Sequence, residues 1–176
     1  KNNYFFHGSD LTKIDQWILE ISLGCLPSHF KSNNLDRNSF QNNTREPKSL
    51  NLEIETQFEN FLSRIIYSHV PQIFIEGYSD LRKSLLNSTW PKNPKIIFTS
   101  NSFDSDDYFK IWAAEKIING SKFVISQHGG LYGSGLIMSP EKFEITISDK
   151  YFSWGWIKDP HQNIVPLPSA KLLSKS

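Results

Sequence analysis

The apolar runs Lys95-Ile-Ile-Phe-Thr99 and Lys122-Phe-Val-Ile-Ser126, with a helical segment between them, decide the fold. Short runs rich in Ile, Val and Phe are typical of strands that are buried on both faces of a sheet. Between them, residues 105–119 place apolar side chains at helical spacing, and Gly120 supplies a C-terminal stop. The order strand, helix, strand predicts a parallel pair joined by a right-handed crossover. We therefore expect a three-layer, Rossmann-like α/β domain with a mainly parallel sheet.

The flanking sequence predicts further elements from periodicity and turn signals. Apolar residues recur at helical spacing within 12–24, over 52–68 and over 79–87. Strands are expected at 72–76, 143–147 and 151–154. The first helix would be capped by Asp10 or Thr12 and would end at Gly24.

The composition divides the chain into three parts. Residues 1–51 hold the first helix and, from 28 to 51, a long loop of mostly polar residues. Residues 52–165 carry the Rossmann-like domain, and 166–176, which begin Pro-Leu-Pro, are typical of a connector. Because the chain starts at Lys1 and its only methionine is internal, we expect a piece of a longer protein whose connector leads to a second domain.

Length and charge exclude several classes of protein. The 176 residues, 38% of them hydrophobic, can bury the core of one ordinary domain. Nineteen basic and eighteen acidic residues give a net charge of +1, which gives no support to nucleic-acid binding. A single cysteine cannot form an internal disulfide, and no apolar stretch approaches the roughly 18–20 residues that cross a bilayer. These features favour a cytoplasmic protein.

The segment Gln127-His-Gly-Gly-Leu-Tyr-Gly133 directly follows the second strand and is the most informative candidate site. Ligands of open α/β sheets bind at the carboxyl ends of the strands. Gly129 and Gly130 allow close approach of the backbone and can turn N–H groups toward an anion. His128 can donate a hydrogen bond or exchange a proton, and Gln127 offers both a donor and an acceptor. The alternative is a glycine-rich turn with one hydrogen-bonded histidine, and the glycine spacing matches neither the dinucleotide fingerprint nor a phosphate-binding loop.

Polar residues after the first strand are expected at the same edge of the sheet. Asn101 and Ser102 are candidates to bind a substrate hydroxyl. Asp104 is a candidate general base, with helix capping as its alternative role. Glu76, at the end of the strand predicted at 72–76, could face the same crevice, and an exposed loop carboxylate is the alternative.

Other constellations of residues are weaker. The five histidines are scattered and have no cysteine partner at ligand spacing, so no metal site is expected. The chain has no Gly-x-Ser-x-Gly nucleophile elbow. Trp154 and Trp156 could stack on a sugar or a base, although alternating tryptophans are more often core or interface residues.

Five motifs occur in order along the second half of the chain. They are Thr99-Ser-Asn-Ser-Phe103, Asp107-Tyr-Phe-Lys-Ile-Trp-Ala-Ala114, Gly120-Ser-Lys122, Gln127-His-Gly-Gly-Leu-Tyr-Gly133 and Ser148-Asp-Lys-Tyr-Phe-Ser-Trp-Gly-Trp156. Together they resemble a family of transferases encoded in bacterial surface-polysaccharide gene clusters, over roughly residues 70–168. The Gln-His-Gly element is also similar to that of capsule-polysaccharide transferases that add Kdo-type sugars.

The resemblance implies a two-domain glycosyltransferase of the GT-B type, which uses a nucleotide-activated sugar as substrate and no essential metal or other cofactor. The motif residues that would line the cleft are Gln127, His128, Gly129 and Gly130, and Tyr132 of the same motif is a further substrate-binding candidate. His128 would contact the leaving phosphate or a sugar carboxylate. The donor nucleotide would rest mainly on a second domain of the same polypeptide, so this chain alone would be inactive.

Sequence and resemblance lead to one hypothesis and two alternatives. An acceptor sugar hydroxyl attacks the anomeric carbon of the donor, the 127–130 loop stabilises the departing phosphate, and Glu76 or Asp104 is the general base. The product would be a surface polysaccharide, made in the cytoplasm with peripheral association at the inner face of the membrane. The alternatives are a non-catalytic carbohydrate- or nucleotide-binding domain, which would also use the Trp154/Trp156 pair, and a structural partner domain.

Overall fold

The computed structural model describes residues 3–27, 56–158 and 163–173. The chain divides into two compact units, one made of Lys1–Ser32 together with Thr89–Ser176 and the other of Asn33–Ser88. The loop expected at 28–51 lies outside the described residues. Within the described ranges, no helix has the length and apolar character needed to cross a membrane.

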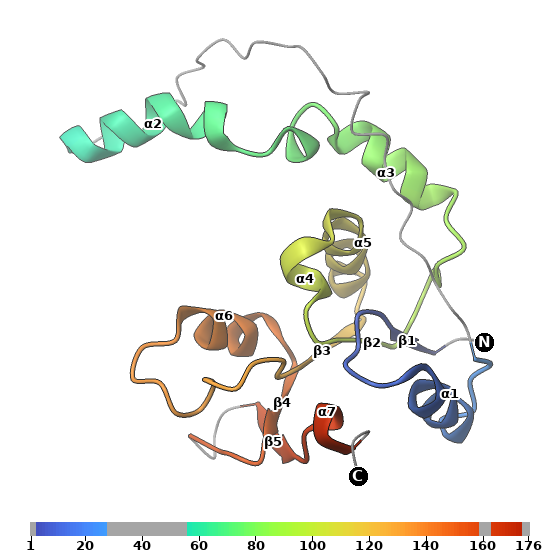
Figure 1. The fold of residues 1–176 in the computed structure, drawn as a ribbon. Helices are drawn as coiled ribbons and strands as arrows, with labels where there is room; N and C mark the ends of the chain where they lie inside the picture. Colours follow the sequence, from blue (N-terminus) through green and yellow to red (C-terminus); the bar gives the residue numbers. More distant parts are fainter. Residues whose placement is uncertain (1–2, 28–55, 159–162, 174–176) are drawn as a thin grey trace. The chain divides into compact units, whose positions relative to one another are not determined.

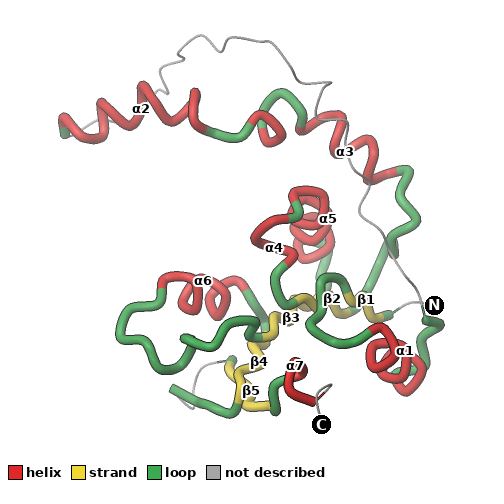
Figure 2. Tube along the Cα trace, viewed as in Figure 1, coloured by secondary structure: helices red, strands yellow, loops and turns green. Residues whose placement is uncertain are grey.

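Five parallel strands form one sheet in the first unit, and their spatial order, β1-β2-β3-β4-β5, is also their order in the chain. The strands are β1 (Tyr4–Phe6), β2 (Ile96–Thr99), β3 (Lys122–Ser126), β4 (Lys150–Trp154) and β5 (Ile164–Leu167). Figure 2 shows them side by side, in yellow. The predicted parallel sheet is confirmed.

Helices flank both faces of this sheet (Figure 1). One side carries α4 (Ser102–Ser105), α5 (Asp107–Ile118) and α6 (Ser139–Ile147), and the other carries α1 (Lys13–Ser22) and α7 (Ala170–Leu173). Of the two residues predicted to cap the first helix, Thr12 caps α1. Gly24 follows the helix with a φ of 73°. The arrangement is a Rossmann-like α/β fold, as the sequence predicts.

An aromatic core holds α5 against the strands. Phe5 of β1 is fully buried, and its ring centroid lies 4.4 Å from that of Trp112 and 5.0 Å from that of Trp90. Ile97 and Ile125, on β2 and β3, are also fully buried. Burial of one large apolar side chain contributes about 1.5–3 kcal/mol, so these contacts supply much of the stability of the unit.

The second unit contains α2 (Gln57–His69), the short 3-10 helix η2 (Gln72–Phe74) and α3 (Tyr78–Leu86). Thr56 and Glu59 form a capping box at the start of α2, in which each side chain accepts from the backbone N–H of the other. Both predicted helices are present, although residues 52–55 lie outside the described ranges. Leu86, the last residue of α3, is 74% exposed.

The strand predicted at 72–76 is wrong. The backbone N–H of Phe74 donates to the carbonyl of Pro71, and this bond closes the 3-10 turn of η2. Glu76 therefore does not end a strand of the sheet, which was the reason for expecting it in the crevice. It belongs to the second unit.

The strand predicted at 143–147 is also wrong, because this segment is the second half of α6. The alternation of Phe143-Glu-Ile-Thr-Ile147 imitates a half-buried strand. Pro140, however, lies in the first turn, where its fixed φ favours a helix. Glu141 and Glu144, three residues apart, both face inward at 4% and 1% exposure.

Two predicted domain boundaries also need correction. The sequence placed residues 1–51 outside the Rossmann-like domain, but Tyr4 pairs with Ile96, so the N-terminal segment supplies an edge strand of the sheet. The connector was expected to begin at Pro166, which instead lies in β5 opposite Ser153. Proline is tolerated there because β5 is an edge strand, where an N–H can be missing without breaking a ladder on both sides.

Candidate functional site

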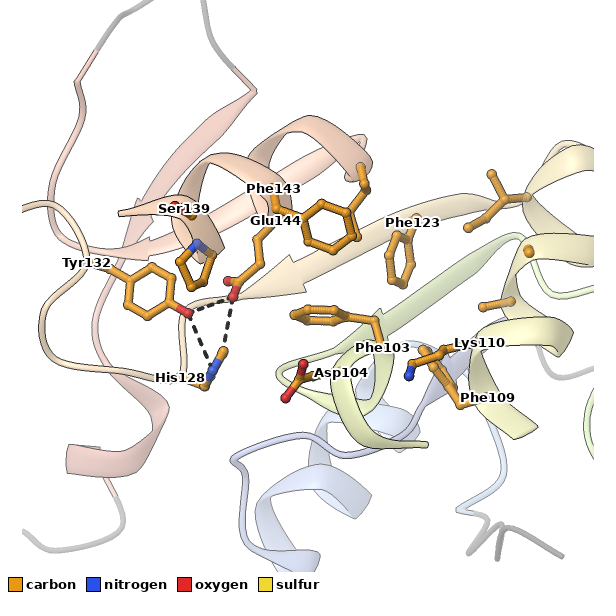
Figure 3. A pocket seen from close by; sticks show the side chains of 15 residues that line it. Phe103, Asp104, Phe109, Lys110, Phe123, His128, Tyr132, Ser139, Phe143 and Glu144 are labelled. Carbon is orange, nitrogen blue, oxygen red and sulfur yellow. Dashed lines mark hydrogen bonds and ion pairs between the residues drawn. The ribbon is translucent and has the colours of Figure 1, made fainter. Parts of the chain in front are cut away.

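A pocket of about 820 Å³ lies along β3 between α5 and α6 and reaches the loops that follow β2 and β3 (Figure 3). Its apolar walls are Phe103, Phe109, Ala113, Ala114, Ile117, Phe123, Pro140, Phe143 and Ile147. Its polar lining residues are Asp104, Lys110, His128, Tyr132, Ser139 and Glu144. A mostly apolar pocket with a few polar groups is the usual form of a small-molecule site.

His128, Tyr132 and Glu144 form a polar cluster in this pocket. The Tyr132 hydroxyl donates to Glu144 Oε1 at 2.7 Å and lies 3.5 Å from His128 Nε2. His128 Nδ1 lies 3.8 Å from the same Glu144 oxygen. Tyr132 and Glu144 are 8% and 1% exposed, whereas the His128 side chain is 28% exposed. The histidine is therefore the member of the cluster that a ligand can reach most easily.

Burial governs the electrostatics of the cluster. Desolvation raises the pKa of Glu144, although the Tyr132 hydroxyl and the charge of His128 act in the opposite direction. Burial and the neighbouring Glu144 carboxylate also raise the pKa of Tyr132 and of the fully buried Tyr151. Tyr132 therefore keeps its proton and remains a hydrogen-bond donor.

Gln127 fixes the start of the loop after β3. Its Oε1 accepts from the backbone N–H of Trp154 and from Nε1 of Trp156, both at 2.8 Å, and its Nε2 donates to the carbonyl of Gly129 at 2.6 Å. The side chain is 2% exposed and ties the ends of β3 and β4 together. Trp156 likewise serves the packing of the fold, since its ring lies against Tyr151 at 6.0 Å.

The two adjacent glycines of the loop have different steric surroundings. A Cβ on Gly129 would lie 2.8 Å from Cε2 of Tyr132, whereas a Cβ on Gly130 would meet no atom within 4 Å. Gly129 thus allows the Tyr132 ring to cross the loop and reach Glu144. Gly130 has space beside it.

The far end of the loop is held by α6. Glu141 Oε2 accepts from the backbone N–H of Gly133 at 2.5 Å, and Glu141 Oε1 pairs with Lys158 Nζ. Gly133 has a φ of 82°, and a Cβ there would meet the Trp156 ring at 2.6 Å. Only glycine fits this position without strain.

The residues after β2 divide between structural roles and the pocket. Ser102 is 5% exposed, and its backbone N–H donates to Thr99 Oγ1 at 3.0 Å. Asn101 is exposed and precedes α4. Asp106, and not Asp104, caps α5 by accepting from the backbone N–H of Phe109. Asp104 is therefore not needed as the cap of α5, and it lines the pocket.

A lysine from α7 contacts the backbone of the site. Lys171 Nζ donates to the backbone carbonyl of His128 at 2.8 Å and lies 3.3 Å from Asp10 Oδ2. The contact fixes the backbone of His128 from a segment more than forty residues away in the chain. Nothing in the local sequence indicated it.

Of the residues proposed from sequence, the structure brings His128, Tyr132 and Asp104 together in the pocket. Gly129 and Gly130 lie in the adjoining loop, while Gln127 and Ser102 are buried beside it. Glu144 was missed, and the helical spacing of the inward Glu141 and Glu144 is the signal that could have found it. Among the residues that the structure describes, no group of three His, Cys, Asp or Glu side chains could hold a metal ion.

The parallel sheet defines the chain as a Rossmann-like α/β protein. Its candidate site reaches the carboxyl ends of the central strands, where such folds bind ligands. The chain belongs to the LIC12162 family of transferases, because the family model described as LIC12162 family transferase matches residues 1–176. No curated protein and no solved structure matches the chain significantly.

Proposed function

We propose that this transferase moves a glycosyl group from a nucleotide-activated sugar, of which Kdo-type acids are the first candidates, to a hydroxyl of a surface-polysaccharide acceptor. The family supports group transfer, and the ordered motifs support the polysaccharide substrate. The observation that carries the proposal is the position of His128, which is 28% exposed in a pocket of about 820 Å³ at the carboxyl end of β3.

The protein has two chemical roles in this reaction. The acceptor oxygen attacks the anomeric carbon, the bond from that carbon to the phosphate oxygen breaks, and its electron pair leaves with the nucleotide. Charge therefore develops on the phosphate and must be stabilised, while the acceptor proton must pass to a base. His128 and Asp104 are the titratable groups of the pocket that were predicted from sequence to act there.

The loop after β3 suits the leaving phosphate. The backbone N–H groups of Gly129 and Gly130 donate to no protein group in the part of the chain that the structure describes. Adjacent free amides at the end of a strand favour an anion. We assign the phosphate to these amides and the reacting carbon to the side of His128.

The proposal extends to the surroundings of the enzyme. The donor nucleotide would bind mainly to a second domain of the same polypeptide, as in GT-B enzymes, and the reaction would take place in the cytoplasm, with peripheral association at the inner face of the membrane. An assay therefore requires the intact protein.

The test is nucleotide release by the intact protein with a panel of nucleotide sugars, beginning with CMP-activated acids, in the presence and absence of glycan acceptors. Acceptor-dependent release is expected, and His128→Ala should lower turnover at least ~100-fold. Leu136→Ala is the matched control, because Leu136 is fully exposed in the same loop region and lines no part of the pocket. Stoichiometric nucleotide binding without release would favour a binding domain, and an unchanged rate for His128→Ala would remove that residue from the mechanism.

A further inference from the structure

Several buried polar atoms in and beside the cluster lie without a hydrogen bond. Among the residues that the structure describes, they include His128 Nδ1, Glu144 Oε2 and the Tyr151 hydroxyl, and the last two belong to side chains that interact with each other. The other carboxylate oxygen of Glu144, Oε1, lies 3.8 Å from Nδ1. An unsatisfied buried polar group costs about 1–3 kcal/mol, so several left in this way within one site call for a functional explanation.

We propose that Glu144 is a positioning residue for catalysis: it holds a proton on Nδ1 of His128, so that Nε2 of the same ring is the general base for the acceptor hydroxyl. The inference deepens the proposed function and rests on it for the identity of the reaction. A ring nitrogen that donates to a carboxylate fixes the tautomer of a neutral histidine and leaves the other nitrogen with its lone pair.

The hydrogen bond of Tyr132 is consistent with a proton on Nδ1 of His128. Its hydroxyl proton is directed to Glu144 Oε1 at 2.7 Å, so it has no proton to give to His128. The distance of 3.5 Å from the hydroxyl oxygen to Nε2 is longer than a normal hydrogen bond, so this contact does little to hold a proton on Nε2. Because Nδ1 is buried, Nε2 is the ring nitrogen that a substrate in the pocket can reach.

Glu144 is the carboxylate best placed to act on the ring. The ionisable groups around His128 come from every neighbouring element: Asp104 from α4, Lys110 from α5, Tyr132 from the loop, Glu141 and Glu144 from α6, Tyr151 from β4 and Lys171 from α7. Glu141 pairs with Lys158, and Lys171 contacts the His128 backbone and Asp10. Asp104 is exposed, so water screens its charge, whereas the charge of the buried Glu144 is screened much less.

The proton balance is complete with these groups. As the acceptor oxygen bonds to the anomeric carbon, its proton moves to Nε2 and the bond to the leaving phosphate breaks. The resulting imidazolium is stabilised by the Glu144 carboxylate, which the ring can approach from the present 3.8 Å. Departure of the products then lets water remove the proton from Nε2.

The decisive measurement is the ¹⁵N spectrum of the histidines in the intact protein at alkaline pH, with selective labelling and with the His128 signals assigned by their loss in His128→Gln. The proposal predicts the Nδ1–H tautomer for His128 in the wild type. Glu144→Gln should shift it toward the Nε2–H tautomer, because the neutral amide removes the negative charge that favours a proton on Nδ1. Glu115→Gln, which removes a carboxylate from α5 outside the pocket lining, should leave the tautomer unchanged.

An Nε2–H tautomer in the wild type would overturn the proposal, and this result needs no folded variant. A tautomer that Glu144→Gln does not change would overturn it as well. In the transfer assay, Glu144→Gln should lower kcat about 10²–10⁴-fold with KM within a few-fold, and Glu144→Asp should restore part of the loss. Absence of transfer with every donor would refute the proposed function, while the spectrum would still decide the role of Glu144.

Discussion

Alanine at Gly129 tests whether this glycine is required to place Tyr132. The added Cβ would lie 2.8 Å from Cε2 of Tyr132, and ordinary contact begins at 3.4 Å, so the ring must retreat by about 0.6 Å. Overpacking of this kind costs about 1–3 kcal/mol. The movement also stretches the 2.7 Å hydrogen bond from Tyr132 to the buried Glu144, and loss of that bond would add about 1–3 kcal/mol.

Gly130→Ala is the matched control. Its Cβ would meet no atom within 4 Å, and both substitutions reduce the freedom of the unfolded chain by the same amount. The difference between the two variants therefore isolates the contact with Tyr132. We expect Gly129→Ala to be less stable than Gly130→Ala by at least about 1 kcal/mol, which lowers Tm by about 2–4 °C for each kcal/mol in a chain of this size.

Thermal unfolding of the intact protein, followed by calorimetry with both variants in the same buffer, provides the measurement. Equal Tm values, or a lower Tm for Gly130→Ala, would show that the loop accommodates a side chain at Gly129 and that the placement of Tyr132 does not depend on the glycine. The transfer assay adds a second comparison, because only Gly129→Ala should disturb the polar cluster.

Two further predictions concern stability. Because the pKa of Glu144 is raised in the folded protein, the stability of the wild type should fall as pH rises through that pKa. Glu144→Gln cannot ionise, so its Tm should match that of the wild type below the usual pKa of 4.5 and exceed it near pH 7. A Tm of the wild type that rises relative to that of the variant with increasing pH would contradict this. Asp106→Ala should lower the free energy of unfolding by at least about 1 kcal/mol, because it removes both the cap of α5 and the 3.0 Å contact of Asp106 Oδ2 with His7 Nε2. Asp104→Ala should change it by less than about 0.5 kcal/mol, and denaturant titration compares the two variants.

The sheet could be predicted where the strands are long and apolar. The strands at Lys95–Thr99 and Lys122–Ser126 were found because each run consists mostly of large apolar residues. β3 is buried on both faces after its first residue, whereas β2 alternates between half-buried and buried residues. β1 was missed, because three residues are too short for a periodic signal and its pairing with β2 depends on residues far away in the chain. The burial of Phe5 comes from this tertiary pairing, which the local sequence does not indicate.

The site could be predicted in position but only partly in detail. His128 follows from a glycine-rich segment at the end of a buried strand, and its place in the pocket agrees with that argument. Glu144 was hidden because its neighbours alternate in polarity as a strand would. Gln127 was expected to bind substrate, but its side chain makes three hydrogen bonds to the protein, whose donors and acceptors come together only in the folded chain.

The position of the second unit in the chain has a consequence for folding. β1 and β2 are neighbours in the sheet, yet all of Asn33–Ser88 lies between them in sequence. The entropy cost of closing such a loop rises by only about 0.6 kcal/mol for each doubling of its length, so the equilibrium hardly depends on the size of the insert. The folding rate depends on it more, because distant pairings form slowly. During synthesis on the ribosome, Phe5 emerges before Ile97 and Trp112, so the first strand lacks its partners in the sheet until the insert has been translated.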